Sequence, residues 1–172
     1  MSASQTNAQS AAARRAAETE LRSLITKFSP THQPLVGTLR RWLRKRLPTA
    51  HEVVYEYADC FVISFSPNEH GYAGVFALRG SADGVKFYFN QGKGLPDPDN
   101  LLQGSGSLVR WIPMEGAATL ARPPVARLID AALAGNRVPF ARTGRGPVVV
   151  RPTAAKQRSN KKPQKERATK NR

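Results

Sequence analysis

The sequence predicts an α+β domain in which two N-terminal helices, about five antiparallel strands and one C-terminal helix form a single fold. Segments with helical apolar spacing lie at both ends of the domain, and strand-like segments are grouped between them. Strands grouped in this way are typical of α+β folds whose helices cover one face of the sheet. The turns between the strands are short, whereas parallel pairing needs a long crossover, so we expect antiparallel neighbours.

The first expected helix spans residues 16–28 and ends at Ser29 and Pro30. The second spans residues 34–46 and ends before Pro48, because proline cannot continue a helix. Each helix carries apolar residues at helical spacing on one face. These residues are Leu21, Leu24, Ile25 and Phe28 in the first helix, and Leu35, Val36, Leu39, Trp42 and Leu43 in the second.

The second helix also carries a basic stripe on its other face. A run of charges on a helix is most often a solvated surface, and the alternative is a surface that contacts phosphates. The stripe consists of Arg40, Arg41, Arg44 and Lys45.

Five strands are expected next, separated by turns rich in Gly, Pro, Asn and Asp. In the second of them, small or polar residues alternate with Phe61, Ile63 and Phe65, which is typical of a strand. A final helix follows, with Pro124 in its first turn and Gly135 placed to cap its end. The expected strands are residues 51–57, 60–66, 72–78, 85–89 and 108–114, and the final helix is residues 124–134.

The positive charge of the chain is concentrated near its C-terminus. The 172 residues include 27 Lys and Arg against 12 Asp and Glu, a net charge of +15. Residues 137–172 hold twelve of these basic residues and one acidic residue, hence +11, which leaves +4 for residues 1–136. The excess charge therefore belongs to a terminal segment and not to the domain.

Composition divides the chain into four segments. Polar segments with few apolar residues cannot bury enough surface to offset the entropy of ordering, so we expect both ends to be disordered. The apolar run Val148–Val150 lies in the linker, and the sequence leaves open whether it docks as a strand or stays an exposed apolar spot. We expect a disordered leader over 1–15, the α+β domain over 16–136, a linker over 137–152 and a disordered basic tail over 153–172.

The cellular setting expected from the sequence is cytoplasmic. A single cysteine, Cys60, excludes an intrachain disulfide and favours a reducing compartment. No apolar run approaches the roughly 20 residues that cross a bilayer. The first fifteen residues lack the apolar stretch of a secretory signal. We therefore expect no membrane association.

Patterns for catalysis or metal binding are sparse. His32, His51 and His70 lie at a helix start, a strand start and a turn, without the spacing of metal ligands. Cys60 is either a thiol nucleophile or a buried small hydrophobe, and the second is favoured because no nearby cation in the sequence would lower its pKa. We predict a protein that is not an enzyme and that holds no resident metal.

Two pairs of carboxylates are candidates for acid–base or metal chemistry. Glu52 and Glu56 share one face of the first strand, and Asp97 and Asp99 lie in an irregular loop. Exposed carboxylates are usually only solvated, and that interpretation is favoured here. Residues 97–100 also resemble a turn into a short helix capped by Asp99 or Asn100.

The irregular loop at residues 90–107 is the expected ligand-binding region of the domain. Glycine-rich turns can direct backbone N–H groups at an anion, and the alternative is that these glycines supply positive φ angles for tight turns. The loop matches neither a Walker loop nor a dinucleotide-binding fingerprint. The candidate ligand-binding residues are Lys93, Asp97, Gly104, Ser105, Gly106 and Arg110.

The globular part of the sequence resembles the YdhG-like family, domain of unknown function 1801. The resemblance covers about residues 17–136 and implies a compact α+β domain with an antiparallel sheet, often compared to frataxin, in a bacterial cytosolic setting. It also implies a possible iron-chaperone role, and no catalytic residues. The matching segments are LRKRLPTAHEVVYEY at 43–57, VKFYFNQG at 85–92, LPDP at 95–98, LLQGSG at 101–106, VRWI at 109–112 and the helix at 124–134.

Two functions follow from these observations. The first is a non-enzymatic binding domain whose basic tail anchors nucleic acid or an acidic partner through phosphate or carboxylate contacts, without sequence readout. The second is a frataxin-like iron chaperone, which would use Asp97, Asp99, Glu52 and Glu56. The tail residues expected to anchor are Lys156, Arg158, Lys161, Lys162, Lys165, Arg167, Lys170 and Arg172. Oligomeric state is left open.

Overall fold

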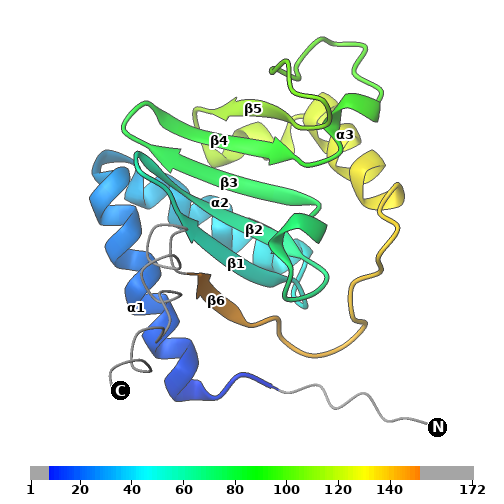
Figure 1. Ribbon diagram of the computed structural model, residues 1–172. Coiled ribbons are helices and arrows are strands. Elements are labelled where there is room, and N and C mark those ends of the chain that lie inside the picture. The colour runs from blue at the N-terminus through cyan, green and yellow to red at the C-terminus, as the bar shows by residue number, and fades with distance from the viewer. Residues whose placement is uncertain (1–7, 152–172) are drawn as a thin grey trace, which may run out of the picture.

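The computed structural model describes residues 8–151, which form one six-stranded sheet backed by helices (Figure 1). Three α-helices, α1 (Ala11–Phe28), α2 (Gln33–Arg46) and α3 (Pro123–Ala134), contribute their apolar faces to a single core with the sheet. The α+β class, the two N-terminal helices and the C-terminal helix are confirmed. Residues 1–7 and 152–172, including the whole of the predicted tail, lie outside the described residues.

The sheet has the strand order β5-β4-β3-β2-β1-β6. Strands β1 to β5 pair with their chain neighbours in antiparallel fashion, as predicted from the short turns. The sixth strand lies beside β1 and is parallel to it. The strands are β1 (His51–Glu56), β2 (Cys60–Ser66), β3 (Phe76–Ser81), β4 (Gly84–Phe89), β5 (Arg110–Met114) and β6 (Val148–Arg151).

The third strand begins later than predicted, at Phe76 instead of residue 72, because a short 3-10 turn, η2 (Gly71–Ala73), precedes it. Two serine hydroxyls of β2 hold this connection. Ser64 Oγ donates to the Gly71 carbonyl and Ser66 Oγ donates to the His70 carbonyl, each at 2.7 Å. The chain from β2 to β3 therefore folds back over one end of the sheet.

The apolar run within the predicted linker docks as β6, which settles a question that the sequence left open. Its register places Val148 opposite Glu52, and the Glu52 amide donates to the Pro147 carbonyl at 2.9 Å. Gln9 closes the outer edge, since its side chain both donates to and accepts from the backbone of Val148. The parallel pairing is possible because the connection through α3 and the linker is long enough for a crossover.

The first helix begins at Ala11, within the predicted leader of residues 1–15. Ser10 caps it, because the Ser10 hydroxyl accepts a hydrogen bond from the Ala13 amide at 3.1 Å. Alanine is the strongest helix former, so the alanine-rich start is compatible with a helix that reaches beyond its amphipathic part. Arg14 then donates to the Gly146 carbonyl at 2.5 Å and ties this extra turn to the segment before β6.

One face of the sheet, here called the covered face, packs against the helices. Its central phenylalanines stack on one another, with 5.1 Å between the ring centroids of Phe76 and Phe87. A side chain at Gly80 would place its Cβ 2.4 Å from the ring of Phe61, so glycine is required there for the ring to lie across β3. Residues of the covered face with no exposed surface are Phe61, Ile63, Phe65, Phe76, Leu78, Phe87 and Phe89.

The covered face also contains a buried network of ion pairs. Glu52, whose side chain is 2% exposed, pairs with Arg40 and Arg44 of α2. The same two arginines pair with Glu18 of α1, at 2.7 and 2.9 Å. The predicted basic stripe of α2 is therefore only partly a solvated surface, and the prediction that Glu52 is solvated is wrong, because its strand position faces the helices.

The opposite face of the sheet is here called the open face, and none of the three α-helices of residues 8–151 packs on it (Figure 1). The turn that contains η2 lies over one end of this face, where Tyr55 packs closely against Gly71. Beyond that turn, the outward side chains of β2, β3 and β4 face away from the core. Within residues 8–151, no helix is both long and apolar enough to cross a membrane.

Candidate ligand-binding hollow on the open face

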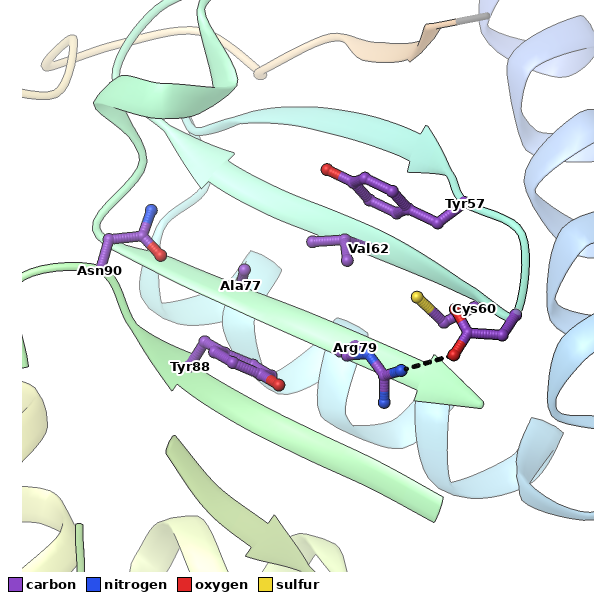
Figure 2. Close-up of a pocket in the computed structure, with 8 residues that line it drawn as sticks. Tyr57, Cys60, Val62, Ala77, Arg79, Tyr88 and Asn90 are labelled. Carbon is purple, nitrogen blue, oxygen red and sulfur yellow. Dashed lines mark hydrogen bonds and ion pairs between the residues drawn. The ribbon is translucent and has the colours of Figure 1, made fainter. Parts of the chain in front are cut away.

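A hollow of about 400 Å³ lies on the open face, and its lining is mostly apolar. It is formed by β2, β3 and β4 together with the two segments that follow β1 and β4 (Figure 2). The hollow, as named here, is lined by Tyr57, Asp59, Cys60, Val62, Ala77, Arg79, Tyr88 and Asn90.

The strand register explains why these residues meet. In the antiparallel pairs, Val62 lies opposite Arg79, and Ala77 lies opposite Tyr88. Directly opposed residues point to the same face of a sheet, so the four side chains share the open face. Because Val62 and Ala77 are small, they form a low floor between larger side chains at the two sides.

Two tyrosines flank this floor. Tyr57 follows β1 and Tyr88 lies on β4, and Figure 2 shows their rings on opposite sides of Val62 and Ala77. Tyr57 is 52% exposed, and Tyr88 is partly exposed. Burial raises the pKa of both phenols, so each hydroxyl keeps its proton at neutral pH and can donate a hydrogen bond.

The polar groups of the hollow lie at its ends. Arg79 makes a long ion pair of 3.4 Å with Asp59, an exposed carboxylate, and donates to the Ser81 hydroxyl at 3.2 Å, which leaves other N–H donors of the guanidinium for a second anion. Asn90 donates from its side-chain amide to the Gly74 carbonyl at 2.6 Å, and its oxygen is turned toward the hollow (Figure 2). The hollow thus offers a cation at one end and an acceptor at the other.

Cys60 is buried beside Arg79 and Asp59, as its strand pattern predicted. Burial raises the pKa of its thiol and outweighs the opposing effect of Arg79. A thiol that keeps its proton is a weak nucleophile. Cys60 therefore contributes apolar surface to the hollow.

The six ligand-binding residues expected from the loop do not line the hollow. Asp97 accepts hydrogen bonds from the amides of Leu101 and Leu102, at 2.9 and 2.8 Å, so its carboxylate organises the loop, and no helix forms there. Arg110 donates to two carbonyls of the same loop, those of Gly106 and Val109.

The remaining loop residues are similarly placed. Gly104 has a φ of 109°, which favours glycine, and lies against the ring of Trp111. The Lys93 amide donates to the Leu108 carbonyl at 2.9 Å, and Ser105 and Gly106 are exposed. These contacts fold the loop back onto β5. They support the interpretation that the glycines serve tight turns.

The carboxylates considered for iron all have other partners. Glu52 lies in the buried network, and Glu56 pairs with Lys27 at 2.6 Å. Asp99 pairs with Arg127 of α3 at 3.2 Å. In the part of the chain from residue 8 to 151, no three His, Cys, Asp or Glu side chains lie close enough together to hold a metal ion.

Comparison with known proteins gives no match for this chain, whether with protein-family models, with curated proteins or with solved structures. The resemblance to the YdhG-like family therefore stays a prediction. The eight tail residues expected to anchor nucleic acid lie outside the described residues.

Proposed function

We propose that this protein is a non-enzymatic binding module whose hollow holds a planar ring that carries an anionic group. The observation that supports this proposal most directly is the pair of tyrosines, Tyr57 and Tyr88, on either side of an apolar floor with Arg79 at its end. The ligand site moves, in this proposal, from the glycine-rich loop to the open face.

The chemistry of the hollow favours a flat, amphipathic ligand. Aromatic side chains stack on planar rings and add about 0.5–1.5 kcal/mol beyond the surface that they bury. Arg79 supplies the only cation of the lining, and a guanidinium forms strong, charge-assisted bonds with phosphate or carboxylate. The two phenols and Asn90 add donors and an acceptor for the edge of a ring.

The basic tail adds a second part to the proposed function. Residues 152–172 carry eight Lys and Arg and one Glu, with no aromatic residue. Such a segment contacts phosphates without reading a sequence, and its binding weakens steeply with salt. We therefore assign to the tail a non-specific anchoring of nucleic acid, which brings the domain close to its ligand.

The hollow is tested by titrating the full chain with uridine monophosphate, a planar base with one phosphate. Tyr88→Leu and Arg79→Gln should each weaken binding by about tenfold or more. Tyr72→Leu is the matched control for the tyrosine, because Tyr72 is 83% exposed and lies outside the hollow. Arg127→Gln is the control for the arginine, since Arg127 also pairs with one exposed aspartate. Equal affinity in all four variants and the parent would overturn the proposal.

The tail is tested separately, in a full-length variant with its eight Lys and Arg changed to Gln. Binding of a duplex DNA is measured across a salt series. We plot the logarithm of the binding constant against the logarithm of the salt concentration. The slope for the parent should be steeper than that for the variant by up to about 7, because each phosphate contact releases counterions. Unchanged affinity and slope in the variant would remove the tail from the proposed function.

A further inference from the structure

We infer that the open face binds single-stranded nucleic acid, one unpaired base in the hollow and the next on a second stacking site formed by Trp111 and Lys86. This inference rests on the proposed function of the hollow, and it names the class of partner.

The second stacking site lies directly beside the hollow. Trp111 of β5 is paired in register with Tyr88 of β4, and their ring centroids are 6.4 Å apart. The Lys86 ammonium lies 4.0 Å from the centroid of the Trp111 ring. Trp111 is partly exposed, on the same face as the hollow. Because the ammonium lies over the ring, a base that stacks there takes the place of Lys86 and has its positive charge beside it.

The spacing of the rings fits successive bases of one chain. Neighbouring strands lie roughly 4.8 Å apart, so the strands of Tyr57 and Tyr88, three positions apart in the sheet, are separated by about 14 Å. One base cannot contact the outer tyrosine and Trp111 together, whereas a chain of two or more bases can. The face is therefore long enough for an extended oligonucleotide that runs across the strands.

The charges along this path are positive. Val62, Arg79 and Lys86 form one row across three strands, and both cations of that row face outward. At the other end, Arg151 of β6 is paired with Tyr55 of β1, so it lies on the open face as well. Asp59 is the one carboxylate that lines the hollow, and it already pairs with Arg79. Phosphates that cross the face thus meet cations at both ends.

The position of β6 links this surface to the tail. Arg151 ends β6, and the chain that follows it carries eight further Lys and Arg. Arg151, the last described residue, therefore lies at the edge of the open face, next to the strand that leads to Tyr57. A nucleic-acid chain that is held by the tail starts close to the stacking sites.

Unpaired bases are favoured over a duplex for a physical reason. The bases inside a duplex are stacked on their neighbours, which cover both π-faces, so tyrosine and tryptophan rings on the sheet surface cannot stack on them. Base stacking on aromatic side chains tolerates any sequence, because every base has a π-face. The open face should therefore prefer single strands without reading their sequence.

The test uses the full-length chain with the eight tail cations changed to Gln, so that only the domain is measured. The probes are a thymidine mononucleotide, a thymidine tetranucleotide, the uridine tetranucleotide and a duplex that contains the same tetranucleotide. The tetranucleotides should bind at least tenfold more tightly than the mononucleotide and the duplex, and the stronger of the two identifies DNA or RNA as the partner.

Two substitutions separate the second site from the hollow. Trp111→Leu should weaken tetranucleotide binding roughly 5- to 150-fold, the loss expected for one stacked base, and leave mononucleotide binding unchanged. Lys86→Gln should also weaken tetranucleotide binding. The control Lys45→Gln, on the exposed side of α2, should leave it unchanged.

A further readout guards against a variant that fails to fold. Trp42 packs against the core and Trp111 lies on the open face, so a Trp42→Phe variant reports only Trp111 by fluorescence. Its emission should be quenched by the tetranucleotide and not by the mononucleotide.

Each outcome has a distinct consequence. Mononucleotide binding that depends on Tyr88, together with tetranucleotide binding that ignores Trp111 and Lys86, would overturn this inference and leave the proposed function standing. If the chain with an unaltered hollow does not bind the mononucleotide at all, the proposed function itself is overturned. Equal affinity for the duplex and the single strand would also contradict the inference.

Discussion

The two faces of the sheet use the same strands for opposite purposes. On β4, Phe87 and Phe89 are fully buried against the helices, whereas Lys86 and Tyr88 alternate with them and reach the open face. The covered face places phenylalanine where no polar atom is needed, and the open face places tyrosine and tryptophan, whose polar atoms tolerate water. The difference shows that an aromatic residue in a strand can be assigned to the core only after the face of the sheet on which it lies is known.

The charges of the two faces differ in the same way. On the covered face, Arg40 and Arg44 are committed to Glu18 and Glu52 in a closed network. On the open face, Arg79 makes a long ion pair with Asp59 and donates to the Ser81 hydroxyl at 3.2 Å, and the Lys86 ammonium lies over the ring of Trp111. Changes on the covered face should therefore cost stability, and changes on the open face should cost binding.

The largest loss of stability is expected from Glu52→Ala. It would remove the more deeply buried of the two carboxylates that Arg40 and Arg44 share, and removal of one member of a buried ion pair costs about 3–5 kcal/mol. Urea unfolding should show this loss, with Glu56→Gln as the control. Glu56 lies on the same face of β1, and its ion pair with the exposed Lys27 contributes no more than about 1 kcal/mol, so this change should cost less than Glu52→Ala. Similar losses of stability in the two variants would contradict the distinction between the buried network of Glu52 and the ion pair of Glu56 with an exposed lysine.

A smaller loss is expected from Gly80→Ala. The added Cβ would meet the Phe61 ring at 2.4 Å, and overpacking of this kind typically costs about 1–3 kcal/mol. Gly116→Ala is the control, because nothing lies within 4 Å of a Cβ at that position. Thermal unfolding of both variants measures the difference. A Gly80→Ala protein as stable as the parent would show that the ring of Phe61 does not cross β3 there.

The network should also shape the acid stability of the fold. Burial by itself would raise the pKa of Glu18, but its hydrogen bonds and ion pairs with Arg40 and Arg44 outweigh burial and lower the pKa to about 2. A carboxyl with a lowered pKa in the folded state stabilises the fold fully above its unfolded pKa of 4.5, and this contribution is lost as the pH falls toward 2.

Glu18→Gln should therefore flatten the dependence of the free energy of unfolding on pH between about 4.5 and 2. Glu20→Gln, on the exposed side of α1, provides the comparison. Chemical unfolding at a series of pH values checks this. If the free energy of unfolding of the Glu18 variant depends on pH below about 4.5 as it does in the parent, the network does not stabilise the Glu18 carboxylate.

The smallest effect on stability is expected on the open face. Tyr57→Ser removes a ring that is half exposed and should lower stability by less than about 1 kcal/mol. The same change should weaken binding of a planar ligand, because one side of the hollow is lost. Differential scanning calorimetry and ligand titration of one sample test both statements. A large loss of stability with intact binding would reverse the roles of the two faces.

The elements governed by local pattern were predictable from the sequence. The second strand has the predicted bounds, and α2 and α3 each begin one residue earlier than predicted, whereas α1 begins five residues earlier. The strand Val148–Arg151 was not decidable, because its pairing with β1 depends on a long connection and not on its own four residues. The added first turn of α1 depends similarly on Gln9 and Arg14, which reach distant backbone groups.

The hollow was missed for a related reason. Its lining comes from several strands, and only the register brings Val62 opposite Arg79 and Ala77 opposite Tyr88. A signal for it was present in the sequence, since Tyr88 alternates with two phenylalanines along β4. For Asp97 the prediction of a ligand contact is not supported, because its carboxylate accepts hydrogen bonds from the backbone amides of Leu101 and Leu102 in the same loop.

The most direct test of the account is a map of backbone amide chemical shifts of the full chain, recorded with and without the thymidine tetranucleotide. The account predicts that shifts within the domain concentrate on the outward positions of the open face, around Tyr57, Val62, Arg79, Tyr88 and Trp111. Residues of α2 and α3 should stay unchanged. Shifts confined to residues 152–172, or centred on the helices, would contradict the claim that the open face holds unpaired bases.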